Sequence, residues 1–396
     1  MTLGVVLSGG GARGAYEAGV LSYVFGDLPR ATGHVPQIKL ICGTSVGAVN
    51  GAFLASVADD PIAGMSRLID LWTGLSLKDI FDFSVRHASR IYRVLLGSEQ
   101  SAGVGLLDSK PMSSMIGREV NWRRLSRNIE NGCIDALTVS TTQVSTGRTV
   151  VWVETAPGVT SPYSLPGGVI MRKDKIHPEH VLASAAIPLL FPPVLIGSDL
   201  YCEGGLRLNT PMAPAIHFGA ERLLVVGMAT PVGIHGSIPA LAPGRAPGAT
   251  FLLGKVLNAF MLDHVTTDLE ELRRMNQMIE AGERAYGPEF MSKVNTELIK
   301  AGHLPRRQVQ AFAVRPSLDI GRLAGEHLRK NARRFNTELG KTFLRLLDIG
   351  EGADADLASY LLFDGDFATR LVDLGRRDAE AKRDELADFL FGTQDP

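Results

Sequence analysis

Two glycine-rich turns, the first after a short apolar run and the second after a β-rich run, constrain the fold of this chain more than any other feature. The first run, residues 3–7 (LGVVL), ends at a glycine triplet, and the second, residues 37–42 (QIKLIC), ends at Gly43. Helical patterns of small and apolar residues follow at 15–24 and 48–58. A strand, a tight turn and a helix, occurring twice in succession, predict parallel strands joined by crossover helices.

Later segments continue this alternation. Four further β-rich runs lie at 136–141, 148–154, 222–228 and 308–314, and the chain after Ser317 is mainly helical in pattern. We therefore expect an α/β fold with a mostly parallel central sheet flanked by helices on both faces, which makes three layers. Residues 351–396 are expected to form a helical C-terminal extension that docks through its aromatic part.

Composition excludes several classes of function. The 396 residues can bury a full core, and a net charge of −1 gives no field that would gather nucleic acid. Three cysteines without metal spacing argue against a disulfide framework or a zinc site. With no secretory leader pattern and no apolar run long enough to span a bilayer, we expect a cytoplasmic protein, with peripheral membrane contact left open.

The second glycine turn has the form Gly-x-Ser-x-Gly. Gly43 and Gly47 flank Ser45 between a predicted strand and a predicted helix. In that context the small flanking residues permit a sharp turn that exposes the serine hydroxyl, so Ser45 is a candidate nucleophile. The alternative is a serine that merely caps the helix.

The first turn has the Gly-x-Gly-x-x-Gly spacing that also occurs in dinucleotide-binding folds. Such a fold needs an acidic residue at the end of the second strand, where this chain has Cys42 and the serine turn. We therefore predict that Gly9, Gly10 and Gly11 direct N–H groups at the oxyanion that forms when Ser45 attacks a carbonyl. Arg13 either adds positive charge there or holds the loop through a structural ion pair.

Three motifs in order along the chain resemble those of the patatin-like phospholipases. Members of that family carry Gly-Gly-Gly-x-Arg-Gly, then Gly-x-Ser-x-Gly, then Asp-Gly-Gly or Asp-Gly-Ala followed by Asn-x-Pro. The corresponding segments here are Gly9 to Gly14, Gly43 to Gly47, and Glu203-Gly204-Gly205 with Asn209-Thr210-Pro211. The stretches 184–188 and 191–193 are also similar to the family's helix and loop before the third motif.

The resemblance implies a lipid acyl hydrolase domain over residues 1–350, with a serine–carboxylate dyad and without a catalytic histidine. Carried onto this chain, Ser45 is the nucleophile and Glu203 stands where the family has its aspartate. The extra methylene moves the carboxylate, and a misplacement of about 1 Å costs on the order of 100-fold in rate. Asp199 is a weaker substitute, and Glu203 as a solvated loop acid is the structural alternative.

Two alternative sites, a catalytic triad and a metal site, would use histidine. A serine, an acid and a histidine in chain order could recruit His217, His264 or His303, none of which lies in a recognisable motif. A metal site at His177 and His180 lacks a third ligand of convincing spacing, so we predict no metal and no organic cofactor.

The predicted activity is hydrolysis of phospholipids or other lipid esters of the phospholipase A or lysophospholipase type. Two alternatives stay open: a catalytically weak lipid-binding or regulatory protein of the same fold, and an acyltransferase. An apolar face over 251–261 could cover the acyl pocket, touch lipid, pack on the sheet or join a second subunit in a homo-oligomer. Basic residues at 86–93 could meet anionic head groups or form a solvated face.

Overall fold

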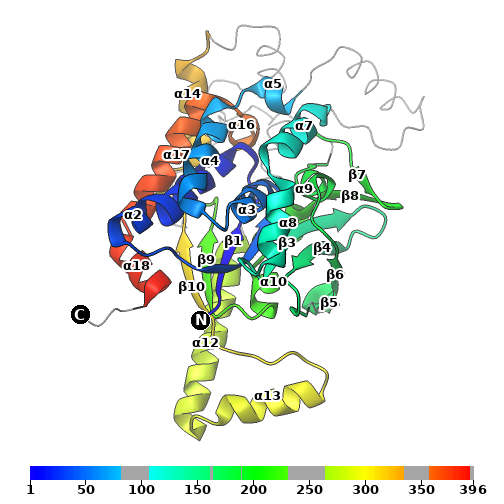
Figure 1. Ribbon diagram of the computed structural model, residues 1–396, viewed down its shortest axis with the longest axis vertical. Coiled ribbons are helices and arrows are strands. Elements are labelled where there is room, and N and C mark those ends of the chain that lie inside the picture. Colours follow the sequence, from blue (N-terminus) through cyan, green and yellow to red (C-terminus); the bar gives the residue numbers. More distant parts are fainter. Residues whose placement is uncertain (82–106, 161–163, 189, 231–263, 334–355, 393–396) are drawn as a thin grey trace, which may run out of the picture.

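A central sheet with helices on both faces organises the molecule (Figure 1). The computed structural model describes residues 1–81, 107–160, 164–188, 190–230, 264–333 and 356–392. Within these ranges ten strands form one sheet, with the order β10-β9-β1-β2-β3-β4-β6-β5 and with β8 and β7 added beside β3. The expected α/β fold with a mostly parallel sheet is confirmed.

The strands divide the sheet into a parallel half and a mixed half. Their bounds are β1 Leu3–Leu7, β2 Ile38–Thr44, β3 Ala136–Gln143, β4 Thr149–Thr155, β5 Ser164–Leu165, β6 Val169–Lys173, β7 Val194–Ile196, β8 Asp199–Glu203, β9 Arg222–Val226 and β10 Gln310–Val314. Strands β10, β9, β1, β2 and β3 pair in parallel, whereas β4 and β8 both run antiparallel to β3. The six predicted strands are present, and the four that sequence patterns missed are β5 to β8.

Helices cover both faces because alternate residues of the central strands are buried on opposite sides. Val5 and Leu7 of β1 belong to the large core, and Val6 belongs to a second core on the other face. The helices are α1 Gly14–Ser22, α2 Leu28–Thr32, α3 Val46–Ser56, α4 Pro61–Gly74, α5 Leu77–Ile80, α7 Lys110–Glu119, α8 Trp122–Glu130, α9 Pro178–Ser184, α10 Met212–His217, α12 His264–Tyr286, α13 Phe290–Lys300, α14 Ile320–Lys330, α16 Asp356–Leu361, α17 Gly365–Glu380 and α18 Arg383–Phe391.

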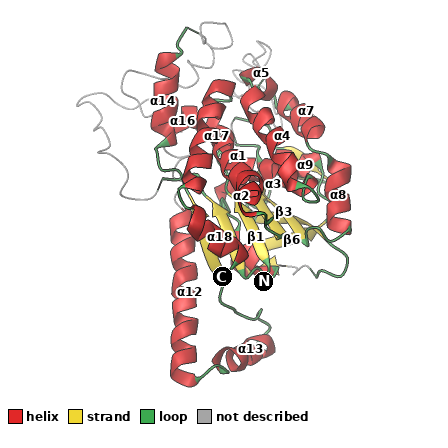
Figure 2. Ribbon diagram, turned by 60° about the vertical axis from the view of Figure 1, so that its left-hand side comes forward, coloured by secondary structure: helices red, strands yellow, loops and turns green. Residues whose placement is uncertain are grey.

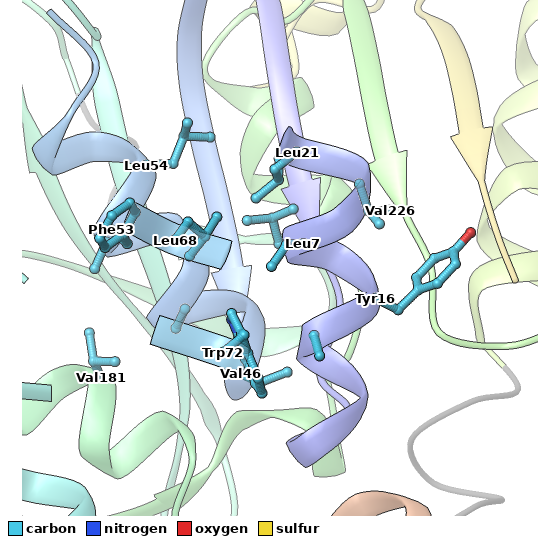
Figure 3. Packing of buried hydrophobic residues seen from close by; sticks show 14 of the residues in the cluster. Leu7, Tyr16, Leu21, Val46, Phe53, Leu54, Leu68, Trp72, Val181 and Val226 are labelled. Atoms are coloured by element: carbon cyan, nitrogen blue, oxygen red, sulfur yellow. The ribbon is translucent and has the colours of Figure 1, made fainter. Parts of the chain in front are cut away.

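The large core lies between the sheet and helices α1, α3, α4 and α17. Figure 3 shows part of it, with Leu21 of α1, Phe53 of α3 and Leu68 of α4. The second core is formed with α10 and the start of α12. From there α12 leads away from the body to α13, at the end of the molecule opposite α5 and α7 (Figure 2).

The C-terminal helices are part of the large core. A Cβ on Gly19 of α1 would collide with the carbonyl oxygen of Val372, and a Cβ on Gly375 of α17 would collide with that of Tyr16. Glycines on both helices therefore allow the two backbones to pack closely. Phe367 is fully buried in the same core. The helical C-terminal region is confirmed, and the domain division at residue 350 stays a prediction.

Some predicted features lie outside the described residues. These are the apolar face over 251–261 and the basic residues at 86–93. Within the described ranges, no helix combines the length and the apolar character that crossing a bilayer requires.

Candidate active site

Ser45 forms the entire turn between β2 and α3. The strand ends at Thr44 and the helix begins at Val46. The φ of Ser45 is 55°, and no other non-glycine residue in the described ranges has a positive φ. Backbone strain of this kind costs on the order of 1–3 kcal/mol and persists only where the surrounding structure enforces it.

The two flanking glycines show how the turn is enforced. A Cβ on Gly43 would collide with the carbonyl oxygen of Gly47, and a Cβ on Gly47 would collide with the carbonyl oxygen of Leu7 in β1. Glycine at both positions therefore lets α3 begin directly against the ends of β1 and β2. The serine is left at the carboxyl edge of the sheet, where α/β folds bind their ligands.

Strand β3 brings the two distant candidate residues together. Thr44, the last residue of β2, pairs with Ser140, and Glu203, the last residue of β8, pairs with the next residue, Thr141. The other edge of β3 is occupied by β4, so β2 and β8 share one edge and approach along it from opposite directions. Their ends meet, which places Ser45 beside Glu203.

The hydroxyl of Ser45 donates a hydrogen bond to Glu203 Oε2 at 2.9 Å. The second carboxylate oxygen, Oε1, accepts the backbone N–H of Gly205, also at 2.9 Å. Both side chains are buried, with Ser45 2% and Glu203 1% exposed. Gly204 is needed at this turn because a Cβ there would collide with the carbonyl oxygen of Ser140.

Burial raises the pKa of Glu203 to about 8, although the Gly205 N–H and the Ser45 hydroxyl both favour the charged form. Desolvation penalises a carboxylate more than these two hydrogen bonds stabilise it. A carboxylate whose pKa lies near neutral pH is a stronger proton acceptor than an exposed one, which suits a general base.

Ser184, at the C-terminus of α9, holds the backbone of Ser45 in place. Its hydroxyl accepts the N–H of Ser45 at 2.8 Å and donates to the carbonyl of Ser140 at 2.6 Å. The turn at Ser45 is thereby attached to β3, the strand that also pairs with β8 and so holds Glu203 in place. Sequence reasoning assigned no role to Ser184, and the one signal for it was its place in the 184–188 stretch.

The first glycine turn lies directly beside Ser45. A Cβ on Gly9 would lie 3.1 Å from the Cβ of Ser45 and would collide with Asn209 Oδ1. The Gly9 N–H already donates to the Asn209 carbonyl at 3.2 Å. Among the described residues, no acceptor is recorded for the N–H groups of Gly10 and Gly11, which leaves these two as the available donors of the triplet.

A family model described as patatin-like phospholipase matches residues 5–216, which is more than half of the chain and includes all three glycine motifs. The chain belongs to the patatin-like phospholipase family. This family consists in general of lipid ester hydrolases. The matched region ends in α10, so β9, β10 and every helix from α12 onward lie beyond it.

No curated protein matches this patatin-like chain. Among solved structures, VipD from Legionella pneumophila is similar at 11% sequence identity with a TM-score of 0.29. That alignment covers 94% of this chain and 67% of VipD. At this level of similarity it supports no argument about fold or function.

An apolar cavity that is partly open to solvent adjoins Ser45 in this patatin-like protein, and the empty space in it, with the open part included, is about 830 Å³. Ser45 and Gly11 line it, and most of the remaining wall comes from aliphatic and aromatic side chains of α3, α4 and α7. On this wall, Trp72 of α4 lies beside Val46 of α3, and Leu68 of α4 lies beside Phe53 of α3 (Figure 3). Such a wall suits a hydrocarbon chain.

Arg13, the arginine of the first motif, is 3% exposed and is held by α16. Its Nε donates to Ser359 Oγ at 2.8 Å, and its guanidinium lies 3.5 Å from Asp356 Oδ1. Of the two roles considered for Arg13, this geometry favours the structural ion pair that holds the loop.

The remaining candidates from the sequence lie elsewhere. Asp199 begins β8, at the opposite end of the strand from Glu203, and pairs with Arg172 at 3.8 Å. His217 bonds through Nδ1 to the Ala213 carbonyl within α10, and no histidine is among the described residues that line the cavity.

The two histidines considered for a metal site cap the start of α9. The Nδ1 of His180 accepts the backbone N–H of His177 at 3.0 Å, and burial lowers the pKa of His180 to about 4. In the described ranges, no three His, Cys, Asp or Glu side chains are grouped as metal ligands.

Proposed function

We propose that this protein hydrolyses lipid esters through a covalent acyl-enzyme on Ser45, with Glu203 as the general base. The observation that carries this proposal is the 2.9 Å hydrogen bond from the Ser45 hydroxyl to the buried Glu203 carboxylate, at a strained turn beside an apolar cavity. A base in direct contact with the nucleophile needs no intervening histidine.

In the acylation step, Ser45 Oγ attacks the ester carbonyl carbon while its proton moves to Glu203 Oε2. The carbonyl oxygen becomes an oxyanion, for which Gly9 to Gly11 were predicted as donors. The N–H groups of Gly10 and Gly11 are the better placed of these, since that of Gly9 is engaged by Asn209. Glu203 then returns the proton to the departing alcohol oxygen as the C–O bond breaks.

In the deacylation step, water attacks the acyl carbon and gives its proton to Glu203. The bond to Ser45 breaks, the proton returns to the serine oxygen, and a fatty acid leaves. Gly205 N–H holds Oε1 through both steps, so that Oε2 stays directed at the reacting oxygen. Removing one well-placed oxyanion donor lowers kcat by about 10²–10³-fold, so we expect the glycine turn to contribute strongly to the rate.

The cavity supports a substrate with a hydrocarbon acyl chain, such as a phospholipid or a related lipid ester. Peripheral membrane contact and self-association remain predictions. Acyl transfer to an alcohol would use the same acyl-enzyme, and product analysis with and without added alcohol separates it from hydrolysis.

Covalent labelling tests the proposal. An alkyl fluorophosphonate should modify the native chain at Ser45, and mass spectrometry of peptides identifies the site. The Ser45→Ala variant should be unlabelled, whereas Ser56→Ala, which alters another buried serine on α3, should label as the native chain does. Labelling at any other residue, or none in a folded native chain, would contradict the proposed nucleophile.

A further inference from the structure

The glycine turn of the candidate site is in direct contact with a segment more than 300 residues later in the chain. Arg13 lies over the ring of Tyr360, with its guanidinium carbon 4.2 Å from the ring centroid, in addition to its bonds to Ser359 and Asp356. Ser359 itself is anchored, because its hydroxyl donates to the Asp356 carbonyl at 2.6 Å. Three residues of α16 thus hold one buried guanidinium.

A second contact fixes the turn two residues earlier. Gly11 has a φ of 57°, and a Cβ there would collide with the carbonyl oxygen of Tyr360. The backbone of the turn therefore lies directly against the backbone of α16 at Gly11, which is itself one of the two candidate oxyanion donors. A shift of α16 cannot leave the directions of the Gly10 and Gly11 N–H groups unchanged.

The same segment also closes one side of the cavity. Tyr360, Leu361 and Phe363 line it together with Ser45. The ring of Phe363 stacks on Trp72 at 6.3 Å and meets the edge of Phe81 at 5.7 Å, which ties the segment to α4 and to the end of α5.

We propose that residues 356–363, which lie beyond the family match, are a working part of this active site: they position the oxyanion turn through Arg13 and complete the acyl cavity. The inference rests on the proposed function. Arg13 is then a positioning residue that acts through the backbone of Gly10 and Gly11, and it does not touch the substrate.

The conformation of the glycine turn depends on the docking of α16 because the charge of Arg13 is buried. A guanidinium removed from water is tolerated only with well-oriented partners, and here α16 supplies them. The turn adopts its conformation together with the docking of α16, because Arg13 would otherwise be buried without partners. A displacement of the donors by about 1 Å is enough to cost on the order of 100-fold in rate.

The test compares two contacts between the C-terminal region and the rest of the chain. Ser359→Ala and Arg13→Lys each weaken the contact at the glycine turn. Arg376→Met is the matched control, because Arg376 of α17 pairs with Asp27 at 2.6 Å and neither residue lines the cavity. Full-length variants are compared for kcat and KM on one ester, for melting temperature, and for hydrogen exchange of the peptide covering residues 9–15.

The expected result is a fall in kcat of about tenfold or more for both turn variants, with KM nearly unchanged, since oxyanion donors act on the transition state. A further variant, Arg13→Met, removes the positive charge that Arg13→Lys keeps. The fall in kcat should therefore be smaller for Arg13→Lys than for Arg13→Met. Exchange of residues 9–15 should increase in the turn variants, while the control should lower the melting temperature without either effect.

Equal changes in kcat and exchange for Arg376→Met and Ser359→Ala would overturn the inference, since stability alone would then explain them. So would unchanged kcat and exchange in the turn variants. If the native chain cleaves no ester and Ser45 is not labelled, the proposed function fails, and the exchange of residues 9–15 still decides whether α16 positions the turn.

Discussion

Shortening the Glu203 side chain by one methylene tests whether this glutamate does the work of the family's aspartate. In Glu203→Asp the carboxylate is withdrawn by about one C–C bond, roughly 1.5 Å. The present distance from Ser45 Oγ to Glu203 Oε2 is 2.9 Å, so the gap grows to more than 4 Å unless the backbone moves. The backbone is held there, because Glu203 pairs with Thr141 and Gly204 lies against the Ser140 carbonyl.

A misplacement of this size predicts a loss in kcat on the order of 100-fold, with KM little changed. A chromogenic ester assay at fixed pH measures it. Glu154→Asp is the matched control, since Glu154 is a buried glutamate of the same sheet whose Oε2 accepts the Ile176 N–H, away from the cavity. An aspartate variant as active as the native chain, or more active, would refute the geometric reasoning and favour a native chain that is catalytically weak.

Four other outcomes follow from the site. Because the pKa of Glu203 is raised to about 8, its carboxylate forms as pH rises through that value, so kcat/KM should increase about tenfold from pH 7 to 9, and a flat profile would contradict this. The same raised pKa makes the folded chain hold a proton that the unfolded chain releases near pH 4.5, so the unfolding free energy of the native chain relative to Glu203→Gln should fall as pH rises toward 8 in denaturant titrations. Ser45→Gly should raise the melting temperature relative to Ser45→Ala, since glycine relieves the strain at φ 55°. Phe53→Ala, which enlarges the cavity about 12 Å along α3 from Ser45, should shift preference toward longer acyl chains in a series of ester lengths, and an unchanged profile would place the acyl chain elsewhere.

The parallel half of the fold was predictable because its signals are local. The run at 3–7 is buried on both faces and continuously apolar, and the run at 37–42 is buried from Leu40 onward. Each run is followed by glycines that the packing requires. Strands β7 and β8 carry no such signal. They form a short hairpin with partly exposed ends, and the pairing of β8 with β3 depends on residues about 60 positions earlier.

The two residues of the candidate dyad also differ in how far the sequence predicts them. Ser45 follows from five consecutive residues, since the glycines that permit the turn are its immediate neighbours. The proximity of Glu203 depends instead on the register of β3, where Ser140 and Thr141 pair with different strands. No local pattern encodes that register, and only the resemblance to a known motif pointed to Glu203 before its position was known.

The role of Arg13 could not be predicted from the sequence, for a physical reason. Its side chain fits either an anion-stabilising role or a structural ion pair, because both need a positive charge beside the glycines. The choice depends on Ser359, whose hydroxyl accepts from Arg13 across 346 positions in the chain. A buried cation takes the role that its partners give it, and these partners lie in a helix whose own sequence carries no catalytic signal. If α16 positions the turn as we propose, a chain cut at residue 350 should lose the ordered glycine turn along with one wall of the cavity.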